Sequence, residues 1–268
     1  MVIFFKNSIL CHGHILEAYL NSTTIKLNKE HKIYPQHVTA ISANHFLEHV
    51  SSSADLFAAY ENANQTVPKI LVYDIGLSGP QALYFQNHEH YIYRKFNFDD
   101  FPPFTTWLVG MTWKVMVWQM CLTEFQACLW LDASIHMYTT PKAIVDKYIY
   151  DRRSSFVFII KPTGHNTAWA THPVMWAYLP SNITKFNEHG GTMDQSGGEI
   201  FYNTEEFKHG IMKWMIACAL TSECMAPNYR LTESRVSFGN QKLNPFGDWS
   251  PKHADKNSSF DPKTLPWI

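Results

Sequence analysis

The chain has 268 residues, of which 46% are hydrophobic and 17% are charged, and its formal net charge is −1. This composition predicts a folded chain with a sizeable core and argues against disorder. The balanced charge, without a strong basic block, argues against nucleic acid as the main partner, because phosphate binding needs concentrated Lys and Arg. Length alone does not choose between one large domain and two small ones.

Cysteine spacing and sequons both favour the lumen of the secretory pathway. Cys218 and Cys224 are spaced so that a disulfide could close a small loop after a helix, whereas Cys121 and Cys128 look like ordinary core residues. Because the chain has five cysteines, at least one of them is unpaired. The expected N-glycosylation sites are sequons, each a match of low specificity, at Asn21, Asn64, Asn182 and Asn257.

No segment of the sequence is apolar over the roughly 20 residues that a membrane-spanning helix requires. Residues 1–5 are apolar, but Lys6 and Asn7 end the run, which is also too short for the core of a signal peptide. We therefore expect a lumenal domain whose membrane contact is only through an anchor that this chain does not contain.

From residue 38 onward the predicted elements alternate between strands and helices, while residues 1–37 lack a clear period and predict an irregular lead-in. Apolar residues three and four positions apart predict amphipathic helices over 46–60 and 107–122. A third helix is expected after a capping box at 203–206, with Phe207, Ile211, Trp214 and Cys218 as its buried stripe. Short apolar runs predict strands over 38–42, 69–74, 91–96, 128–131, 155–160 and 199–202.

This alternation predicts an α/β domain over residues 38–239, with a mostly parallel sheet flanked by helices. Residues 240–268 are rich in Asn, Pro, Lys, Ser and Asp, so we expect an extended or disordered tail. Ligands of open α/β sheets bind outside the carboxyl ends of the strands. The apolar strand at 128–131 runs directly into Asp132 and Ser134, which makes this strand end the first candidate for a site. The alternative for Asp132 is a turn cap.

Other polar residues lie at comparable positions. Lys114 on the second helix could neutralise a diphosphate as a point charge, although a solvated or snorkelling lysine is the alternative. Asp74 also ends a strand, but the Ile-Gly-Leu-Ser turn beside it gives a plain structural explanation. Three polar residues end or follow the first strand, where helix capping is the alternative role: Thr39, Ser42 and Asn44.

Seven segments occur in an order that resembles one family. Among them are Tyr73-Asp-Ile-Gly-Leu-Ser78, Trp113-Lys114 and Trp130-Leu-Asp-Ala-Ser134, and the others are residues 38–46, 171–175, 214–220 and 224–227. Each segment is weak alone, whereas the ordered combination is specific. The order resembles the domain-of-unknown-function 1647 family, which is abundant in nematodes and similar to glycosyltransferases of the Rossmann-like GT-A fold. The resemblance covers roughly residues 38–227.

The resemblance implies a Golgi glycosyltransferase that moves a sugar from a nucleotide sugar, with a UDP-sugar favoured, to a glycan or glycoprotein acceptor. GT-A enzymes usually hold Mn²⁺ on the donor diphosphate with an Asp-x-Asp motif, which corresponds here to Asp132 and Ser134. Asp132 is thus the expected ligand of Mn²⁺ or Mg²⁺, since hard oxygen ligands suit both ions. The expected donor-binding residues are Thr39, Ser42, Asn44, Asp74, Lys114, Asp132 and Ser134.

Catalysis by an inverting transferase needs a carboxylate that deprotonates the acceptor hydroxyl. Asp194 and Glu199 flank the turn at Gly197 and Gly198 and are the candidates for this role. Glycine allows close approach of the backbone to an acceptor, but an ordinary turn before a strand explains the two glycines equally well.

Two departures from the family pattern favour a second hypothesis, a non-catalytic or truncated lumenal binding or interaction protein on the same scaffold. Ser134 stands where the second acid is expected. The pattern also continues beyond the Cys-x-x-Pro segment with a His and an Asp-Gln-Ser stretch, which residues 228–235 do not match. Detectable sugar transfer would separate the two hypotheses. A third one, an α/β-hydrolase, is disfavoured because the sequence has no Gly-x-Ser-x-Gly elbow.

Overall fold

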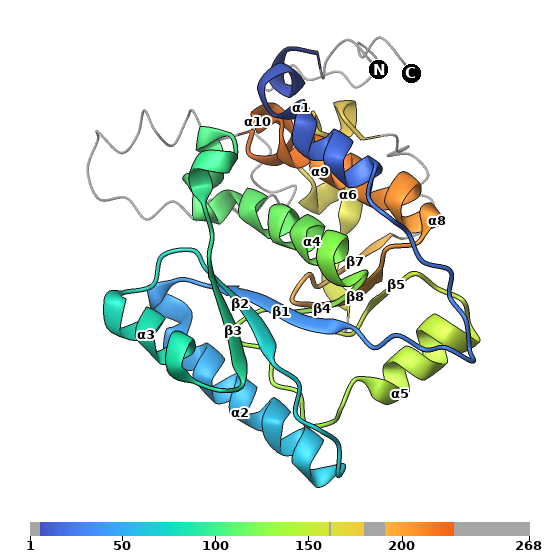
Figure 1. Ribbon diagram of the computed structural model, residues 1–268. Coiled ribbons are helices and arrows are strands. Elements are labelled where there is room, and N and C mark those ends of the chain that lie inside the picture. The colour runs from blue at the N-terminus through green and yellow to red at the C-terminus, as the bar shows by residue number, and fades with distance from the viewer. Residues whose placement is uncertain (1–5, 161, 180–190, 228–268) are drawn as a thin grey trace.

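A six-stranded sheet runs through the centre of the molecule (Figure 1). The computed structural model describes residues 6–160, 162–179 and 191–227. Three strand pairs are parallel and two are antiparallel, which confirms the expected mostly parallel α/β fold. From edge to edge, the strands are β3 (Tyr91–Lys95), β2 (Ile70–Asp74), β1 (Gln36–Ile41), β4 (Ala127–Leu131), β8 (Gly198–Tyr202) and β5 (Phe156–Phe158).

Helices cover both faces of this sheet (Figure 1). One face carries α1 (Lys6–Leu20), α4 (Thr112–Phe125) and α9 (Lys213–Ala219), and the other carries α2 (Phe46–Asn62), α3 (Gly79–Asn87) and α5 (Lys142–Ile144). α5 continues as a π-helix, η5 (Val145–Asp151). A separate two-stranded sheet pairs β6 (Pro162–Asn166) with β7 (Thr192–Asp194). The short helices are η1 (Ala43–His45), η2 (Phe98–Asp100), η3 (Pro103–Thr106), η4 (Leu108–Gly110), α6 (Thr167–Ala170), η6 (Pro173–Ala177), α8 (Glu205–Phe207), η7 (Lys208–Met212) and α10 (Ser222–Met225).

Side chains of the central strands alternate between two apolar clusters, as expected for a sheet that is buried on both sides. The cluster on the α4 side includes Cys128 and Trp130 of β4 and Phe201 of β8. The cluster on the α2 side takes their neighbours, including Leu129 and Ile200. The sequence of β4 is therefore continuously apolar because each of its two faces meets a layer of helices.

The expectation of an irregular lead-in is wrong for the residues that form α1. Tyr19 and Ile15 on this helix are buried in the α4-side cluster, and the Tyr19 hydroxyl donates a 2.8 Å hydrogen bond to Oδ1 of Asn203. The helix is stabilised by these contacts with distant parts of the chain. Its own sequence has little helical periodicity, so periodicity could not reveal it.

The helix expected at 107–122 begins only at Thr112, because Met111 has a left-handed backbone with φ 55° and separates α4 from η4. The description of this helix as amphipathic is also wrong, since ten of its residues are buried. α4 packs against β1 and β4 on one side and α9 on the other. A helix that is buried on both sides has no polar face. Lys114 is therefore among the buried residues of α4.

The helix after 203–206 differs from the predicted stripe. Thr204 caps it, because its hydroxyl accepts a hydrogen bond from the Phe207 amide. The π-helical segment η7 then inserts an extra residue and rotates the following face. As a result, Ile211 is 41% exposed and Met212 is fully buried.

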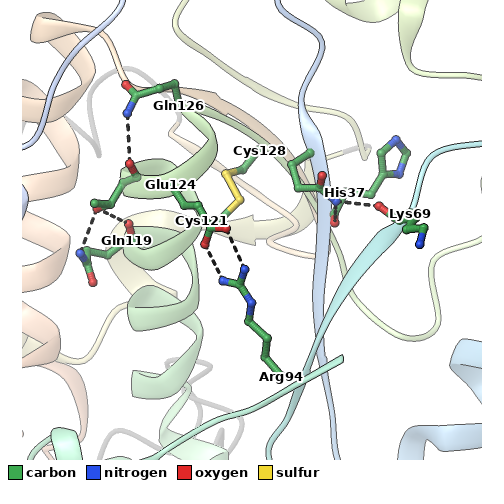
Figure 2. Close-up of a disulfide and its surroundings, with 10 residues drawn as sticks. His37, Lys69, Arg94, Gln119, Cys121, Glu124, Gln126 and Cys128 are labelled. Carbon is green, nitrogen blue, oxygen red and sulfur yellow. Dashed lines mark hydrogen bonds and ion pairs between the residues drawn. A yellow bond between two sulfur atoms is a disulfide. The ribbon is translucent and has the colours of Figure 1, made fainter. Parts of the chain in front are cut away.

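The described residues form two disulfides, and one of them corrects the sequence analysis. The expected pair Cys218–Cys224 is formed. Cys121 and Cys128, expected to be ordinary core residues, form the second disulfide, which joins α4 to β4 (Figure 2). Both are fully buried, so burial alone did not distinguish them from core cysteines.

Within the described residues, no helix is both long enough and apolar enough to cross a bilayer. Asn21 and Asn64 are exposed, and their glycosylation stays a prediction. Several predictions fall on parts of the chain outside the described residues, namely those for Asn182, Asn257, residues 228–235 and the tail at 240–268.

Candidate functional site

The strand order creates a switch point between β1 and β4. From β1 the chain proceeds to β2 and β3 on one side, and then crosses to β4 on the other side of β1. In open α/β sheets, this reversal leaves a crevice at the carboxyl ends of the two diverging strands, where ligands bind. The Thr39 hydroxyl donates a 2.7 Å hydrogen bond to the carbonyl of Leu131 and ties the ends of β1 and β4 together. Asp132 follows Leu131 directly, so it lies at this switch point.

Asp132 is held with one carboxylate oxygen fixed and the other open. Oδ1 accepts a 2.8 Å hydrogen bond from Nζ of Lys114 and a 2.7 Å hydrogen bond from Nε1 of Trp130. The Asp132 amide donates to the carbonyl of Gly197 at 2.8 Å, which extends the pairing of β4 with β8 by one residue. The Asp132 side chain is 40% exposed. An oriented, partly exposed carboxylate results.

Lys114 lies in the first turn of α4, and the geometry of the helix explains why it reaches Asp132. α4 runs back along β4 after a short turn, so the beginning of the helix meets the end of the strand. Fourteen helical residues rise about 21 Å and five strand residues about 17 Å, which brings the two ends to similar heights. The solvated or snorkelling alternative for Lys114 is wrong, because the residue is only 5% exposed.

The ammonium group of Lys114 has three kinds of partner. Besides Asp132, Nζ donates a hydrogen bond to the carbonyl of Ser196, and it lies 5.0 Å from the ring centroid of Trp130 and 5.6 Å from that of Trp118. Carboxylate, carbonyl and ring faces together compensate for the loss of water around a buried cation. The positive charge is thus built into the site.

Glu199 is the second acid near this ammonium. It lies opposite Trp130 in the antiparallel pairing of β4 with β8, and it is 1% exposed. Neither carboxyl oxygen has a hydrogen-bond partner within the described part of the chain. Burial raises the pKa of Glu199 to about 8, a value that includes a lowering by the charge of Lys114 and a smaller raising by the charge of Asp132. Glu199 is therefore mostly protonated at neutral pH.

Gly197 and Gly198 allow β8 to pack closely on its surroundings. A Cβ at Gly198 would lie 2.7 Å from Cγ1 of Ile159, a distance that the packing does not permit. A Cβ at Gly197 would lie 3.3 Å from Oδ2 of Asp132. Any side chain at Gly197 would therefore crowd the second carboxylate oxygen of Asp132.

The remaining predicted site residues are not all part of this cluster. Asp74 accepts hydrogen bonds at Oδ1 from the amides of Gly76 (2.9 Å) and Leu77 (2.7 Å), and at Oδ2 from the Tyr93 hydroxyl (2.7 Å). These contacts explain Asp74 as a turn residue, so we leave it out of the proposed site. Asp194 ends β7 in the small separate sheet.

Three smaller polar residues lie around the two strand ends. Ser42 is half-buried at the start of η1, and its side chain does not cap that helix. Asn44 and Ser134 are exposed, one after β1 and the other after β4. The structure thus leaves all three side chains available to a ligand at the switch point, and their donor-binding role stays a prediction.

Trp130 and Ser196 contribute to the site but were not predicted. Trp130 stands two residues before Asp132, and the pairing with β8 continues to Asp132, so both side chains lie on the α4 side of the sheet. That period of two was the available signal. The Ser196 contact is made by a backbone carbonyl, and side-chain patterns do not reveal such contacts.

A divalent metal fits these residues poorly. The described residues contain no group of three or more His, Cys, Asp or Glu side chains placed to hold a metal ion. Lys114 is paired with the one candidate ligand, Asp132, and would repel a second cation there. The predicted binding of Mn²⁺ or Mg²⁺ therefore has no support in the described part of the chain.

The amino-terminal part of the chain matches a family model. Residues 9–119 match the model described as "Protein of unknown function (DUF1647)". This supports the resemblance inferred from the ordered segments, and it begins earlier than expected, within α1. The DUF1647 match includes β1, Asp74 and Lys114 and ends before β4. A search of curated proteins found no match.

Several solved glycosyltransferase structures are similar to this chain. Galactosyltransferase LgtC, in complex with donor and acceptor sugar analogues, has a TM-score of 0.40 and 12% identity, with 79% of this chain and 68% of that chain covered. Mannosyltransferase Ktr4p from S. cerevisiae, in complex with GDP, has a TM-score of 0.41 and 9% identity, with coverages of 80% and 72%. Core-mannan synthase A from Aspergillus fumigatus, in its Mn/GDP form, has a TM-score of 0.39 and 12% identity, with coverages of 75% and 69%. At these values the similarities decide neither the fold nor the site.

Proposed function

We propose that this protein binds a nucleotide sugar at the switch point between β1 and β4 and acts as a glycosyltransferase-like protein of the secretory pathway. The observation that carries the proposal is the placement of Asp132, an oriented and partly exposed carboxylate at the carboxyl end of β4. Crevices at such positions bind nucleotides in α/β folds generally. The two disulfides support an oxidising compartment such as the Golgi lumen.

The proposed ligand is a UDP-sugar, with a glycan or glycoprotein as acceptor. Ser42, Asn44 and Ser134 are proposed to contact the donor from the two strand ends, and Thr39 to position them through its bond to Leu131. Asp132 supplies the central polar contact. Lys114 balances its charge, so a negatively charged diphosphate is not repelled from the crevice.

A second function, ligand binding without sugar transfer, is favoured by the state of the acids. Glu199 is buried and mostly protonated, which suits neither contact with an acceptor nor removal of its proton. Asp194 is the other candidate base, on the small β6–β7 sheet. Ser134 in place of an acid points in the same direction. The proposal therefore rests on donor binding, and transfer is tested separately.

Calorimetric titration of the purified chain with UDP-glucose tests the proposal. We expect saturable binding by the wild type and at least a tenfold weaker interaction for Asp132→Ala, about 1.4 kcal/mol or more. The matched control is Asp151→Ala, which breaks an exposed ion pair between the end of η5 and Lys29 and should bind UDP-glucose normally. Equal binding by all three proteins would contradict the role of Asp132.

Sugar transfer is then measured by release of UDP from a panel of UDP-sugars in the presence of glycan acceptors. Release that depends on an acceptor supports the transferase. UDP binding without any release favours the binding protein.

A further inference from the structure

Asp132 has the position of a metal ligand in the predicted motif, but its surroundings are those of a paired carboxylate. Its Oδ1 already receives two hydrogen bonds, one from an ammonium group at 2.8 Å and one from an indole at 2.7 Å. Oδ2 accepts no hydrogen bond within the described residues, and the side chain is 40% exposed. Oδ2 is thus a single, pre-oriented hydrogen-bond acceptor at the strand end.

We propose that Oδ2 of Asp132 accepts hydrogen bonds from vicinal hydroxyl groups of the ligand, and that Lys114 makes this site independent of a divalent cation. The proposal rests on the proposed function, because the hydroxyl groups are those of a nucleotide sugar. They belong either to its ribose or to its pyranose, and both present the same chemistry.

The charge balance of the cluster supports this assignment. Lys114 and Asp132 form an ion pair at 2.8 Å, in which the two charges balance each other. An isolated carboxylate beside a diphosphate would repel it, and a metal ion is one way to remove that repulsion. Here the ammonium group has the same effect from within the fold.

The hydrogen-bonding capacity of the carboxylate supports the hydroxyl groups as the partner. An ionised carboxylate only accepts hydrogen bonds, and bonds from hydroxyl groups to it are charge-assisted. Fixing Oδ1 with Lys114 and Trp130 removes the rotational freedom of the side chain before the ligand arrives. The same two contacts hold Oδ1 away from a metal ion.

The first test measures Mn²⁺ binding directly by electron paramagnetic resonance of the free ion, without nucleotide. Wild type and Asp132→Asn are expected to leave the same concentration of free Mn²⁺ at neutral pH. Uptake of one equivalent by the wild type that Asp132→Asn lacks would overturn the proposal. Asp151→Asn serves as the matched control, because it breaks a Lys–Asp pair elsewhere.

The second test compares UDP and UDP-glucose titrations in a chelator and in Mn²⁺. The expected affinities agree within about twofold between the two conditions. An increase of tenfold or more in Mn²⁺ would overturn the inference while leaving the proposed function intact. Absence of UDP and UDP-glucose binding under both conditions would instead overturn the proposed function, and the hydroxyl role of Asp132 with it.

The third test identifies the hydroxyl groups. We expect Asp132→Asn to weaken UDP-glucose about tenfold, the loss of one charge-assisted bond. If the affinity of the variant for UDP falls by the same factor, the hydroxyl groups are those of the ribose. If its affinity for UDP is unchanged, they are those of the pyranose. Unchanged affinity for both ligands would overturn the proposal. A ligand series on the wild type alone, with 2′-deoxy-UDP and UDP-2-deoxyglucose, gives the same information should Asp132→Asn fail to fold, and undiminished affinity for both analogues would overturn it.

Discussion

Lys114 determines the charge of the β4 strand end, and its removal should therefore affect stability as well as binding. Lys114→Met keeps most of the apolar volume but leaves Asp132 without its ammonium partner. Since Asp132 is partly exposed, we expect a loss of about 2 kcal/mol, between the values for exposed and buried pairs. Urea unfolding at neutral pH measures this loss.

The matched control for this prediction is Lys29→Met. Lys29 pairs with Asp151 at 3.0 Å, but both side chains are more than half exposed. Water screens such a pair, so the expected change is below about 0.5 kcal/mol. Equal losses for the two variants would contradict the view that burial makes the Lys114 pair special.

At this scale the sequence predicted part of the site for reasons that can be named. Asp132 was predicted because an apolar strand leads directly into it. The Ile-Gly-Leu-Ser turn after Asp74 had already offered a structural role for that residue. The burial of Lys114 and its pairing with Asp132 could not be predicted. Helical periodicity shows that a polar residue stands among apolar ones, but it does not show which residues of other elements contact it. The carbonyl of Ser196 and the indole of Trp130 complete the environment of Lys114, and both come from other strands and loops.

Among the helices, the segment α8–η7–α9 offers a clean test of its π-turn. Met212 is fully buried after the π-turn, whereas Ile211 is 41% exposed. We expect Met212→Ala to lower the free energy of unfolding by about 3 kcal/mol and Ile211→Ala by less than about 1 kcal/mol. Urea unfolding of both variants measures these losses. A larger loss for Ile211→Ala than for Met212→Ala would contradict the π-turn and favour a regular helix that buries Ile211 and Trp214.

The disulfide between α4 and β4 fixes the two elements that carry Lys114 and Asp132. Its loop is short, with a sequence separation of seven, so the chain-entropy model gives about 2–3 kcal/mol of stabilisation. The double variant Cys121→Ala/Cys128→Ala should lose this amount in denaturant unfolding. Peptide mapping without reductant checks the bond itself, and free thiols at both positions would contradict it.

The strands were predicted more completely than the helices, and the reason is physical. A strand buried on both faces is continuously apolar and short, so β2 and β4 stand out from their surroundings. The helices α1 and α4 depend on what covers them. α1 has little period and is held by Tyr19 and Ile15, while α4 has no polar face because α9 covers the side away from the sheet.

For the whole molecule, three buried titratable groups predict a stability maximum near pH 6.5. Burial lowers the pKa values of His37 and His49 to about 4, below the ordinary 6.5, and raises that of Glu199 to about 8, above the ordinary 4.5. The contribution of the two histidines to the free energy of unfolding is fully present above pH 6.5 and is lost as the pH falls toward 4. The contribution of Glu199 to the free energy of unfolding is fully present below pH 4.5 and is lost as the pH rises toward 8.

Between pH 4.5 and 6.5, the effect of two histidines exceeds that of one glutamate, so stability rises by about 1.4 kcal/mol per pH unit from these groups. Between pH 6.5 and 8 it falls by about the same amount per unit. Urea midpoints across this range measure the profile. Glu199→Gln should abolish the fall on the alkaline side and steepen the rise between pH 4.5 and 6.5 to about 2.7 kcal/mol per pH unit, because only the two histidines then contribute. A variant with the wild-type alkaline fall would contradict the assignment.

The location of the ligand is the central claim, and hydrogen–deuterium exchange of the unmodified protein with and without UDP tests it most directly. We predict slower exchange for the amides of residues 131–135 and 196–198, where β4 ends beside Gly197, and for residues 42–45 after β1. Exchange in the second half of α2 and in β3 should stay unchanged, since both lie away from the switch point. Slower exchange confined to other segments, or no change at saturating UDP, would contradict a nucleotide site at the end of β4.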